Sequence, residues 1–156
     1  MMSLACPRPS ADACILVGGL GVGFTLASAL QHLGQDAEVV VAELVPGVVE
    51  WNRGPLGEHA GHPLRDGRVV VREVDVAIIL REEGRAFDAI LLDVDNGPEG
   101  LTQKGNDWLY SRAGLNVIQR TLRPKGVLAV WSAGTDPAFS KRLRKAGFEV
   151  DEIPVR

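Results

Sequence analysis

The sequence reads CILVGGLGVG from residue 14 to residue 23. Residues 14–17 form a continuous apolar run, which predicts a strand buried on both faces of a parallel sheet. The glycines that follow predict a tight turn, because glycine adopts positive φ angles and lets a ligand approach the backbone. Residues 22–33 have helical character and predict that a helix follows the turn. The expected inward-facing residues of this helix are Phe24, Leu26, Ala27, Leu30 and Leu33.

The same alternation of strand and helix continues along the chain. Further strands are expected at residues 37–44, 68–74, 87–92, 127–131 and 148–155. Helices are expected from Pro46 and at residues 76–83, 106–122 and 136–146, with loops at residues 52–67 and 95–105. Strands that alternate with helices are joined by right-handed crossovers, which produce a mostly parallel sheet covered on both faces. We therefore expect one doubly wound, Rossmann-like α/β domain over residues 14–156, after a flexible leader at residues 1–13.

The composition indicates an ordinary globular domain. The 156 residues are 46% hydrophobic and 24% charged, with a net charge of −3. The sequence contains no run of basic residues that would indicate a nucleic-acid partner. It also contains no apolar run of about 18 residues that would indicate a membrane span. Cys6 and Cys14 have no neighbouring cluster of histidine or cysteine, so we expect neither a disulfide framework nor a metal site. A cytoplasmic location is the corresponding expectation.

The glycine-rich turn predicts a ligand site. Gly19, Gly21 and Gly23 form a G-x-G-x-G pattern, whereas the dinucleotide fingerprint G-x-G-x-x-G would need glycine at the position of Phe24. Glu43 ends the second expected strand about 20 residues later, where a carboxylate can accept hydrogen bonds from both ribose hydroxyls. Turn and acid together indicate an adenosine-containing ligand. The alternatives are a tight turn without a ligand and a solvated carboxylate at a strand end.

Two more carboxylates close expected strands. Asp75 follows the third strand and Asp93 follows the fourth. Ligands of open parallel sheets bind beyond the carboxyl ends of the strands, so we expect both to share a crevice with Glu43. Asp75 can accept a hydrogen bond from an adenine amine, and Asp93 and Asp95 can bind an ammonium group or accept its proton. The alternative for Asp93 is a turn residue in an Asp-x-Asp-Asn-Gly loop.

From residue 14 to residue 131 the chain resembles the polyamine aminopropyltransferases, whose type member is spermidine synthase and whose fold is that of S-adenosylmethionine-dependent methyltransferases. The matching segments are ILVGGLGVG at residues 15–23, AELVPGVVE at 42–50, the strand at 68–75, FDAILLD at 87–93, Leu109-Tyr110, and LRPKG at 122–126. The resemblance implies that Glu43 holds the ribose and Asp75 the adenine of S-adenosylmethionine or its decarboxylated form. It implies further that Asp93 is the catalytic base and that Asp95 or Asn96 contributes to substrate binding.

The resemblance also sets the functional expectations. It implies a transferase that moves an aminopropyl or methyl group to an amine such as a polyamine. Gly21 stands where the family has an aspartate that grips the aminopropyl amine, and we expect a methyltransferase-like core that lacks the family's N-terminal β-region and its last strand. The alternative is a non-catalytic module of the same fold that binds a nucleoside or a partner. Family members often form dimers, so a homodimer is expected. A nicotinamide-dependent oxidoreductase is a third hypothesis, which the glycine spacing disfavours.

Overall fold

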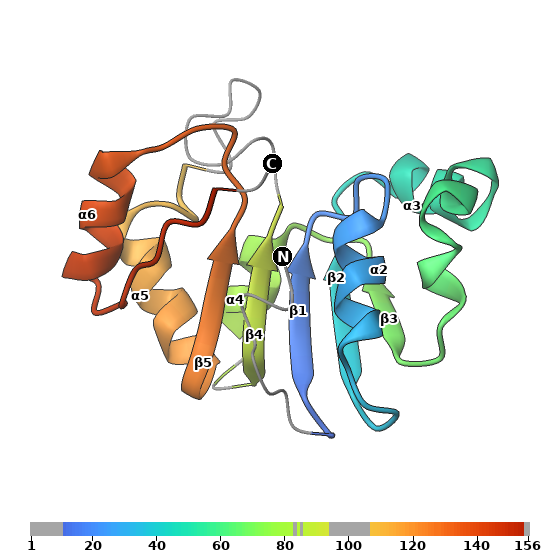
Figure 1. Ribbon diagram of the computed structural model, residues 1–156, viewed down its shortest axis with the longest axis horizontal. Helices are drawn as coiled ribbons and strands as arrows, with labels where there is room; N and C mark the ends of the chain where they lie inside the picture. Colours follow the sequence, from blue (N-terminus) through green and yellow to red (C-terminus); the bar gives the residue numbers. More distant parts are fainter. Residues whose placement is uncertain (1–10, 83, 85, 94–106, 155–156) are drawn as a thin grey trace.

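The computed structural model describes residues 11–82, 84, 86–93 and 107–154. Within them, five parallel strands form one sheet in the order β3-β2-β1-β4-β5 (Figure 1). The strands are β1 (Cys14–Gly18), β2 (Glu38–Ala42), β3 (Val69–Arg72), β4 (Phe87–Leu92) and β5 (Leu122–Val130). The expected Rossmann-like α/β fold with a parallel sheet is confirmed.

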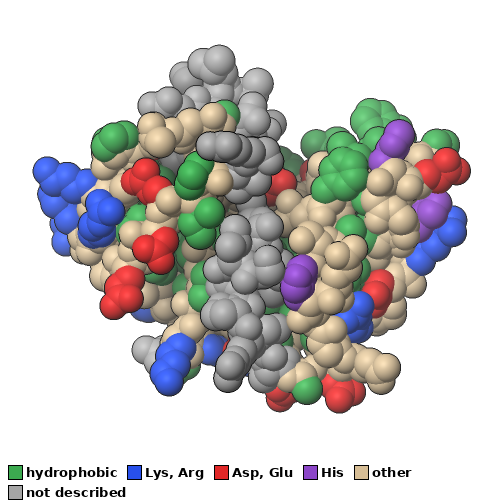
Figure 2. Space-filling view, in the orientation of Figure 1, with side chains coloured by type: hydrophobic (Ala, Val, Ile, Leu, Met, Phe, Trp, Pro, Cys, Tyr) green, Lys and Arg blue, Asp and Glu red, His purple; other side chains and the backbone are tan. Residues whose placement is uncertain are grey.

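Helices connect successive strands, as crossovers between parallel strands require. The connecting helices are α2 (Phe24–Gln31), α3 (Pro46–Arg53), α4 (Val76–Glu82) and α5 (Arg112–Thr121), and α6 (Pro137–Lys145) follows β5. The start of α6 agrees with the prediction, because the Asp136 side chain accepts a hydrogen bond from the Phe139 N–H at 2.9 Å and Pro137 occupies the first turn. The Lys and Arg side chains of α6 lie at the surface (Figure 2).

Both faces of the inner strands β1, β2 and β4 are buried, which explains their continuous apolar sequences. Side chains of β1 alternate between the faces, with Leu16 in one apolar cluster and Ile15 and Val17 in the other. The Leu16 cluster includes side chains of α4, α5 and α6, whereas the Ile15 cluster includes side chains of α2 and α3. A strand covered on both faces needs no polar side, and this is why β1 and β4 appear in the sequence as continuous apolar runs.

Phe24 was expected to face inward, and this prediction is wrong. Its side chain is 60% exposed, while Leu26, Ala29 and Leu30 are buried. These three residues have the spacing of a single helix face, and Gly23 as the N-cap sets the start of that face. Phe24 therefore lies outside the buried stripe.

The strand expected at residues 148–155 is also wrong for the described part, residues 148–154, which form no strand. The N–H of Phe148 donates to the Leu143 carbonyl at 3.1 Å, so the segment begins by closing the end of α6. Beyond it, Ile153 is half exposed and Pro154 has no N–H to donate to a neighbouring strand. The segment therefore alternates polar and apolar residues without pairing with the sheet.

Two further expectations need correction. The segment 52–67 contains the end of α3 and two 3₁₀ helices, η1 (Pro55–Ala60) and η2 (Pro63–Arg65), where a loop was expected. The helix expected at residues 106–122 begins at Arg112, because Ser111 is its N-cap and accepts the Gly114 N–H at 3.1 Å.

Residues 95–105, expected to form a loop, lie outside the described residues. In the part of the chain that is described, no helix has the length and apolar character needed to cross a membrane.

Candidate functional site

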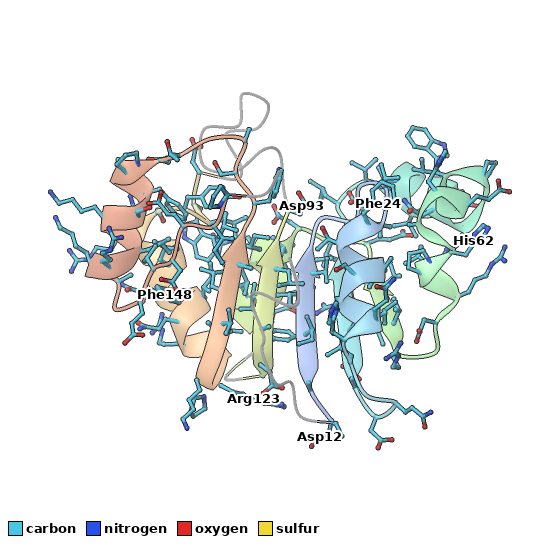
Figure 3. All side chains as sticks on the ribbon, in the orientation of Figure 1. Asp12, Phe24, His62, Asp93, Arg123 and Phe148 are labelled. Atoms are coloured by element: carbon cyan, nitrogen blue, oxygen red, sulfur yellow. The ribbon has the colours of Figure 1, made fainter. Side chains whose placement is uncertain are left out.

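The register of the sheet places two of the predicted carboxylates on either side of the glycine turn. Gly18, the last residue of β1, is paired with Ala42 in β2, and Glu43 follows directly. On the other side the N–H of Asp93 donates to the Gly18 carbonyl at 2.9 Å. The order of the strands reverses between β1 and β4, and ligands of such sheets bind at this switch point. Figure 3 shows Asp93 at the edge of the sheet where the strands end.

The three glycines of the turn all have left-handed backbone angles but differ in their surroundings. Their φ values are 89° at Gly19, 51° at Gly21 and 89° at Gly23. A Cβ atom at Gly23 would lie 3.1 Å from Asn52 Oδ1 and 3.2 Å from Pro63 Cγ, whereas one at Gly21 would meet no atom of the described residues within 4 Å. Gly23 is therefore required by packing against α3 and η2. Among the described residues, none fills the space that Gly21 faces.

Glu43 is directed at the turn. The residue is 9% exposed, and its Oε2 accepts the Leu20 N–H at 2.9 Å while its Oε1 accepts the Val45 N–H at 3.0 Å. A carboxylate has about four lone-pair sites, so each oxygen can accept one more hydrogen bond. The carboxylate is thus held in one orientation beside the turn and keeps acceptor capacity for two hydroxyl groups.

Asp93 is exposed and lies against the beginning of α2. Its Oδ2 accepts a hydrogen bond from the Thr25 hydroxyl at 2.9 Å, and Thr25 belongs to the first turn of that helix. A carboxylate is favourable at a helix N-terminus, where backbone N–H groups point outward. A dinucleotide would place its pyrophosphate at the same helix end, so a resident carboxylate opposes a phosphate and favours a neutral or cationic ligand.

Asp75 has a structural role that the sequence did not reveal. Its Oδ1 accepts the Ala77 N–H at 2.8 Å, and its carbonyl accepts the Ile78 N–H at 2.9 Å. Asp75 therefore acts as the N-cap of α4. The next residue, Val76, lies 3.1 Å from the position that a Cβ atom of Gly18 would take, so the start of α4 packs against the base of the turn. The predicted substrate-binding residues Asp95 and Asn96 lie outside the described residues.

Two side chains of the site were missed from the sequence. Thr25 positions Asp93, and Asn52 donates from Nδ2 to the Gly21 carbonyl at 2.8 Å. A signal was present for Asn52, because it follows Val48 and Val49 by four and three residues and so lies on the inward face of α3. A polar residue on such a face needs a buried hydrogen-bonding partner.

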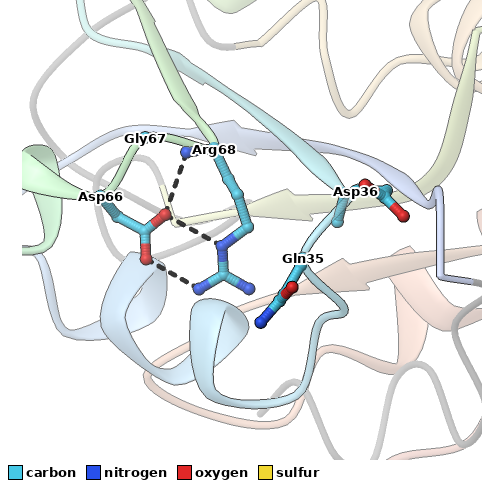
Figure 4. Close-up of a pocket in the computed structure, with 6 residues that line it drawn as sticks. Gln35, Asp36, Asp66, Gly67 and Arg68 are labelled. Atoms are coloured by element: carbon cyan, nitrogen blue, oxygen red, sulfur yellow. Dashed lines mark hydrogen bonds and ion pairs between the residues drawn. The ribbon is translucent and has the colours of Figure 1, made fainter.

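Two open hollows lie away from this site. One, of about 490 Å³, is lined by residues 35–37 and 66–68 at the amino ends of the strands (Figure 4). There the Arg68 guanidinium pairs with Asp66 at 2.7 Å and donates to the carbonyls of Leu33 and Gly34. The side-chain hydrogen bond from Arg68 lowers the pKa of Asp66 to about 2. Arg68 thus donates hydrogen bonds both to Asp66 and to the backbone that follows α2. These polar groups are paired with one another, so this hollow is a structural feature of the fold.

The second hollow lies beside α3. It is about 350 Å³ in volume and is lined by Trp51, Pro55, Leu56 and His59. Trp51 is 63% exposed, and apolar side chains are visible over this part of the molecule in Figure 2. His62, labelled in Figure 3, lies in the same region. Among the described residues, no group of three or more His, Cys, Asp or Glu side chains could hold a metal ion.

Comparison with solved structures identifies the fold. Spermidine synthase from Thermotoga maritima matches with a TM-score of 0.70 and 19% identity over 93% of this chain and 50% of its own. A spermidine synthase in complex with the transition-state analogue AdoDATO matches with a TM-score of 0.67 and 20% identity, over 89% of this chain and 45% of its own. The CurJ carbon methyltransferase gives 0.57 and 17%, over 88% and 34%. The chain has the spermidine synthase-like, methyltransferase-like fold and spans half or less of these proteins.

Comparison of sequences adds one distant relative. No protein-family model matches the chain. A polyketide synthase–nonribosomal peptide synthetase hybrid of Aspergillus japonicus is 26% identical over 138 residues, which are 85% of this chain and 3% of that enzyme. The family resemblance seen in the sequence is confirmed, at the level of the fold, by the solved structures.

Proposed function

We propose that this domain binds S-adenosylmethionine or decarboxylated S-adenosylmethionine over the glycine turn and transfers its methyl or aminopropyl group to an amine. The observation that carries the proposal is the Glu43 carboxylate, fixed against the Leu20 N–H at 2.9 Å. In this position it can accept hydrogen bonds from both hydroxyls of a ribose that lies over the turn. Asp75, at the start of α4, would accept from the adenine amine.

The charges at this edge of the sheet favour a sulfonium ligand. Glu43 and Asp93 flank the turn, and Asp75 lies one strand further out. A positive sulfur gains from nearby carboxylates, whereas a pyrophosphate would meet Asp93 at the α2 N-terminus. S-adenosylmethionine is therefore favoured over a nicotinamide dinucleotide.

Apolar side chains next to Glu43 supply a surface for the purine ring. Leu44 is 50% exposed and Val45 is 48% exposed, directly after the ribose-binding acid. Nucleoside pockets combine an apolar lining with a few placed polar groups, and a flat ring over these side chains would remove apolar area from water. The arrangement suits an adenine whose amine is directed toward Asp75.

The transfer needs alignment and one proton acceptor. The amine nitrogen attacks the carbon next to the sulfonium, the carbon–sulfur bond breaks, and its electron pair stays on sulfur as a neutral thioether. The attacking nitrogen becomes cationic, and its proton passes to the Asp93 carboxylate. Because the positive sulfur is already a good leaving group, most of the rate enhancement would come from holding the two reactants in line. The structural match to a spermidine synthase complexed with a transition-state analogue supports this chemistry.

A non-catalytic module is the second candidate, and one residue favours it. Gly21 stands where the aminopropyltransferases carry an aspartate, and no described residue lies within 4 Å of the position that a Cβ atom there would take. A domain without that carboxylate has no group at this position to grip the amine of decarboxylated S-adenosylmethionine. Binding of the nucleoside without turnover over a panel of amines would support the module.

Calorimetric titration tests the proposal. The wild-type chain would be titrated with S-adenosylmethionine, decarboxylated S-adenosylmethionine, methylthioadenosine and a nicotinamide dinucleotide. We expect Glu43→Gln to weaken adenosine binding by roughly ten-fold to a hundred-fold, the order expected when a hydrogen bond to a charged acceptor is lost. Glu50→Gln is the matched control, because it is the same glutamate-to-glutamine substitution at an exposed position of α3. The proposal fails if the wild type binds none of the three adenosine compounds or if both variants bind equally.

A further inference from the structure

Asn52 joins α3 to the glycine turn from a fully buried position. The residue is 1% exposed, and its Nδ2 donates to the carbonyls of Gly21 and Val48, both at 2.8 Å. A carboxamide can make both bonds because its NH₂ group carries two donors. Glu43, from the preceding strand end, accepts the N–H of Leu20. Two side chains of the β2–α3 unit therefore hold two consecutive residues of the turn.

The other end of the same amide indicates what these bonds are for. Oδ1 of Asn52 is buried and has no hydrogen-bonding partner among the described residues. Rotating the amide would not help, because the oxygen would then face the carbonyls of Gly21 and Val48. A buried acceptor without a partner is unfavourable, so this cost offsets part of the stability that the two hydrogen bonds of Asn52 contribute. The compensating gain is the bond to the turn.

Holding the turn matters because of its composition. Gly19, Gly21 and Gly23 all have positive φ, and glycine has more backbone freedom to lose than any other residue. An unrestrained turn would sample many conformations, and a ligand would have to order it on binding. A turn that is already ordered binds the ligand more tightly, because its conformational entropy was lost during folding and is not lost again on binding.

We propose that Asn52 is a positioning residue that keeps the glycine turn in its ligand-binding shape. The inference rests on the proposed function, since it assigns to Asn52 part of the affinity for the nucleoside. Asn52 does this without contact with the ligand, through the Gly21 carbonyl. Substitution of Asn52 therefore loosens the turn and weakens nucleoside binding, while the sheet and its core remain intact.

Two variants separate the bond to the turn from the bond within the helix. Asn52→Ser retains a hydroxyl, which can donate to the carbonyl of Val48 one helical turn back but is too short for Gly21. Asn52→Ala loses both bonds. Thr121→Val is the matched control: Thr121 is also 1% exposed, and its single hydroxyl hydrogen is shared between the carbonyl of Val117 within α5, at 2.8 Å, and that of Leu80 in α4, at 3.3 Å.

Binding is measured with S-adenosylmethionine and methylthioadenosine by calorimetry, at a temperature at which every variant is folded by circular dichroism. We expect Asn52→Ser and Asn52→Ala to bind about ten-fold more weakly than wild type, and Thr121→Val to bind within about two-fold of it. Equal affinities for the Asn52 variants and Thr121→Val would overturn the inference while leaving the proposed function intact.

Amide hydrogen exchange of the ligand-free protein gives a second readout. The Leu20 N–H bonds to Glu43 and the Gly23 N–H bonds to the Leu20 carbonyl at 2.8 Å, so both report on the turn. In Asn52→Ser these two amides should exchange about ten-fold faster than in Thr121→Val, while that of Leu16 in β1 exchanges at the same rate in both. Unchanged exchange at Leu20 and Gly23 would overturn the inference. Wild type that binds neither compound would overturn the proposed function and the affinity role of Asn52 together, and exchange would still show whether Asn52 holds the turn.

Discussion

Replacing Gly23 by alanine, with Gly21→Ala as its partner variant, tests how the turn is built. Both residues have positive φ, so both variants incur the backbone penalty of about 1–2 kcal/mol for an L-residue in the left-handed region. Only at Gly23 would the new methyl group meet neighbours, Asn52 Oδ1 at 3.1 Å and Pro63 Cγ at 3.2 Å. Asn52 cannot move aside without losing its two hydrogen bonds. Overpacking of this kind adds about 1–3 kcal/mol.

The expected totals are therefore distinct. Gly23→Ala should lower the free energy of unfolding by about 2–5 kcal/mol and Gly21→Ala by about 1–2 kcal/mol. Urea denaturation measures both values, and thermal unfolding should show the extra loss at Gly23 as a drop in Tm of about 3 °C per kcal/mol for a chain of this size. The interpretation is refuted if the two variants lose the same stability within about 0.5 kcal/mol.

The same pair also separates stability from ligand binding. A methyl group at Gly21 would project into space where no atom of the described chain lies within 4 Å. If a nucleoside occupies that space, Gly21→Ala should fold well and bind S-adenosylmethionine poorly. Unimpaired binding by Gly21→Ala would show that the ligand does not lie over this residue.

Two further predictions concern carboxylates. The side-chain and backbone hydrogen bonds of Arg68 hold the pKa of Asp66 at about 2, so the pair stabilises the folded state fully above about pH 4 and progressively less as the pH falls toward 2. Asp66→Asn should cost about 1 kcal/mol in urea denaturation at pH 7, after discounting for solvent screening, and much less near pH 2; a pH-independent difference would contradict this cause. Asp93→Asn should abolish transfer to amines and also weaken S-adenosylmethionine binding, because a carboxylate near the sulfonium is lost, whereas Asp12→Asn, at the opposite edge in Figure 3, should change neither. Unchanged turnover in Asp93→Asn would remove Asp93 as the base.

The sequence was sufficient for features that depend on neighbouring residues. The apolar runs of β1 and β4, the glycines between β1 and α2, and the acid after β2 are local patterns, and the structure places them as the patterns predicted. Predictions from the local sequence were wrong where the segment or side chain does not make the contacts that its pattern indicated. Residues 148–154 alternate as a strand would, yet they do not pair with the sheet, and Phe24 lies beside rather than within the buried face of α2.

Only the tertiary structure could decide which side chains meet. Glu43 contacts Leu20 across 23 positions of sequence, Asn52 contacts Gly21 across 31, and Thr25 contacts Asp93 across 68. These contacts depend on the order and register of the parallel strands, which crossover helices set over long distances and which no short window of sequence contains. The amino-acid sequence therefore determined that a glycine turn and an acid would face a common edge of the sheet. The packing of β2, α3 and β4 around β1 determined which side chains hold that turn in place.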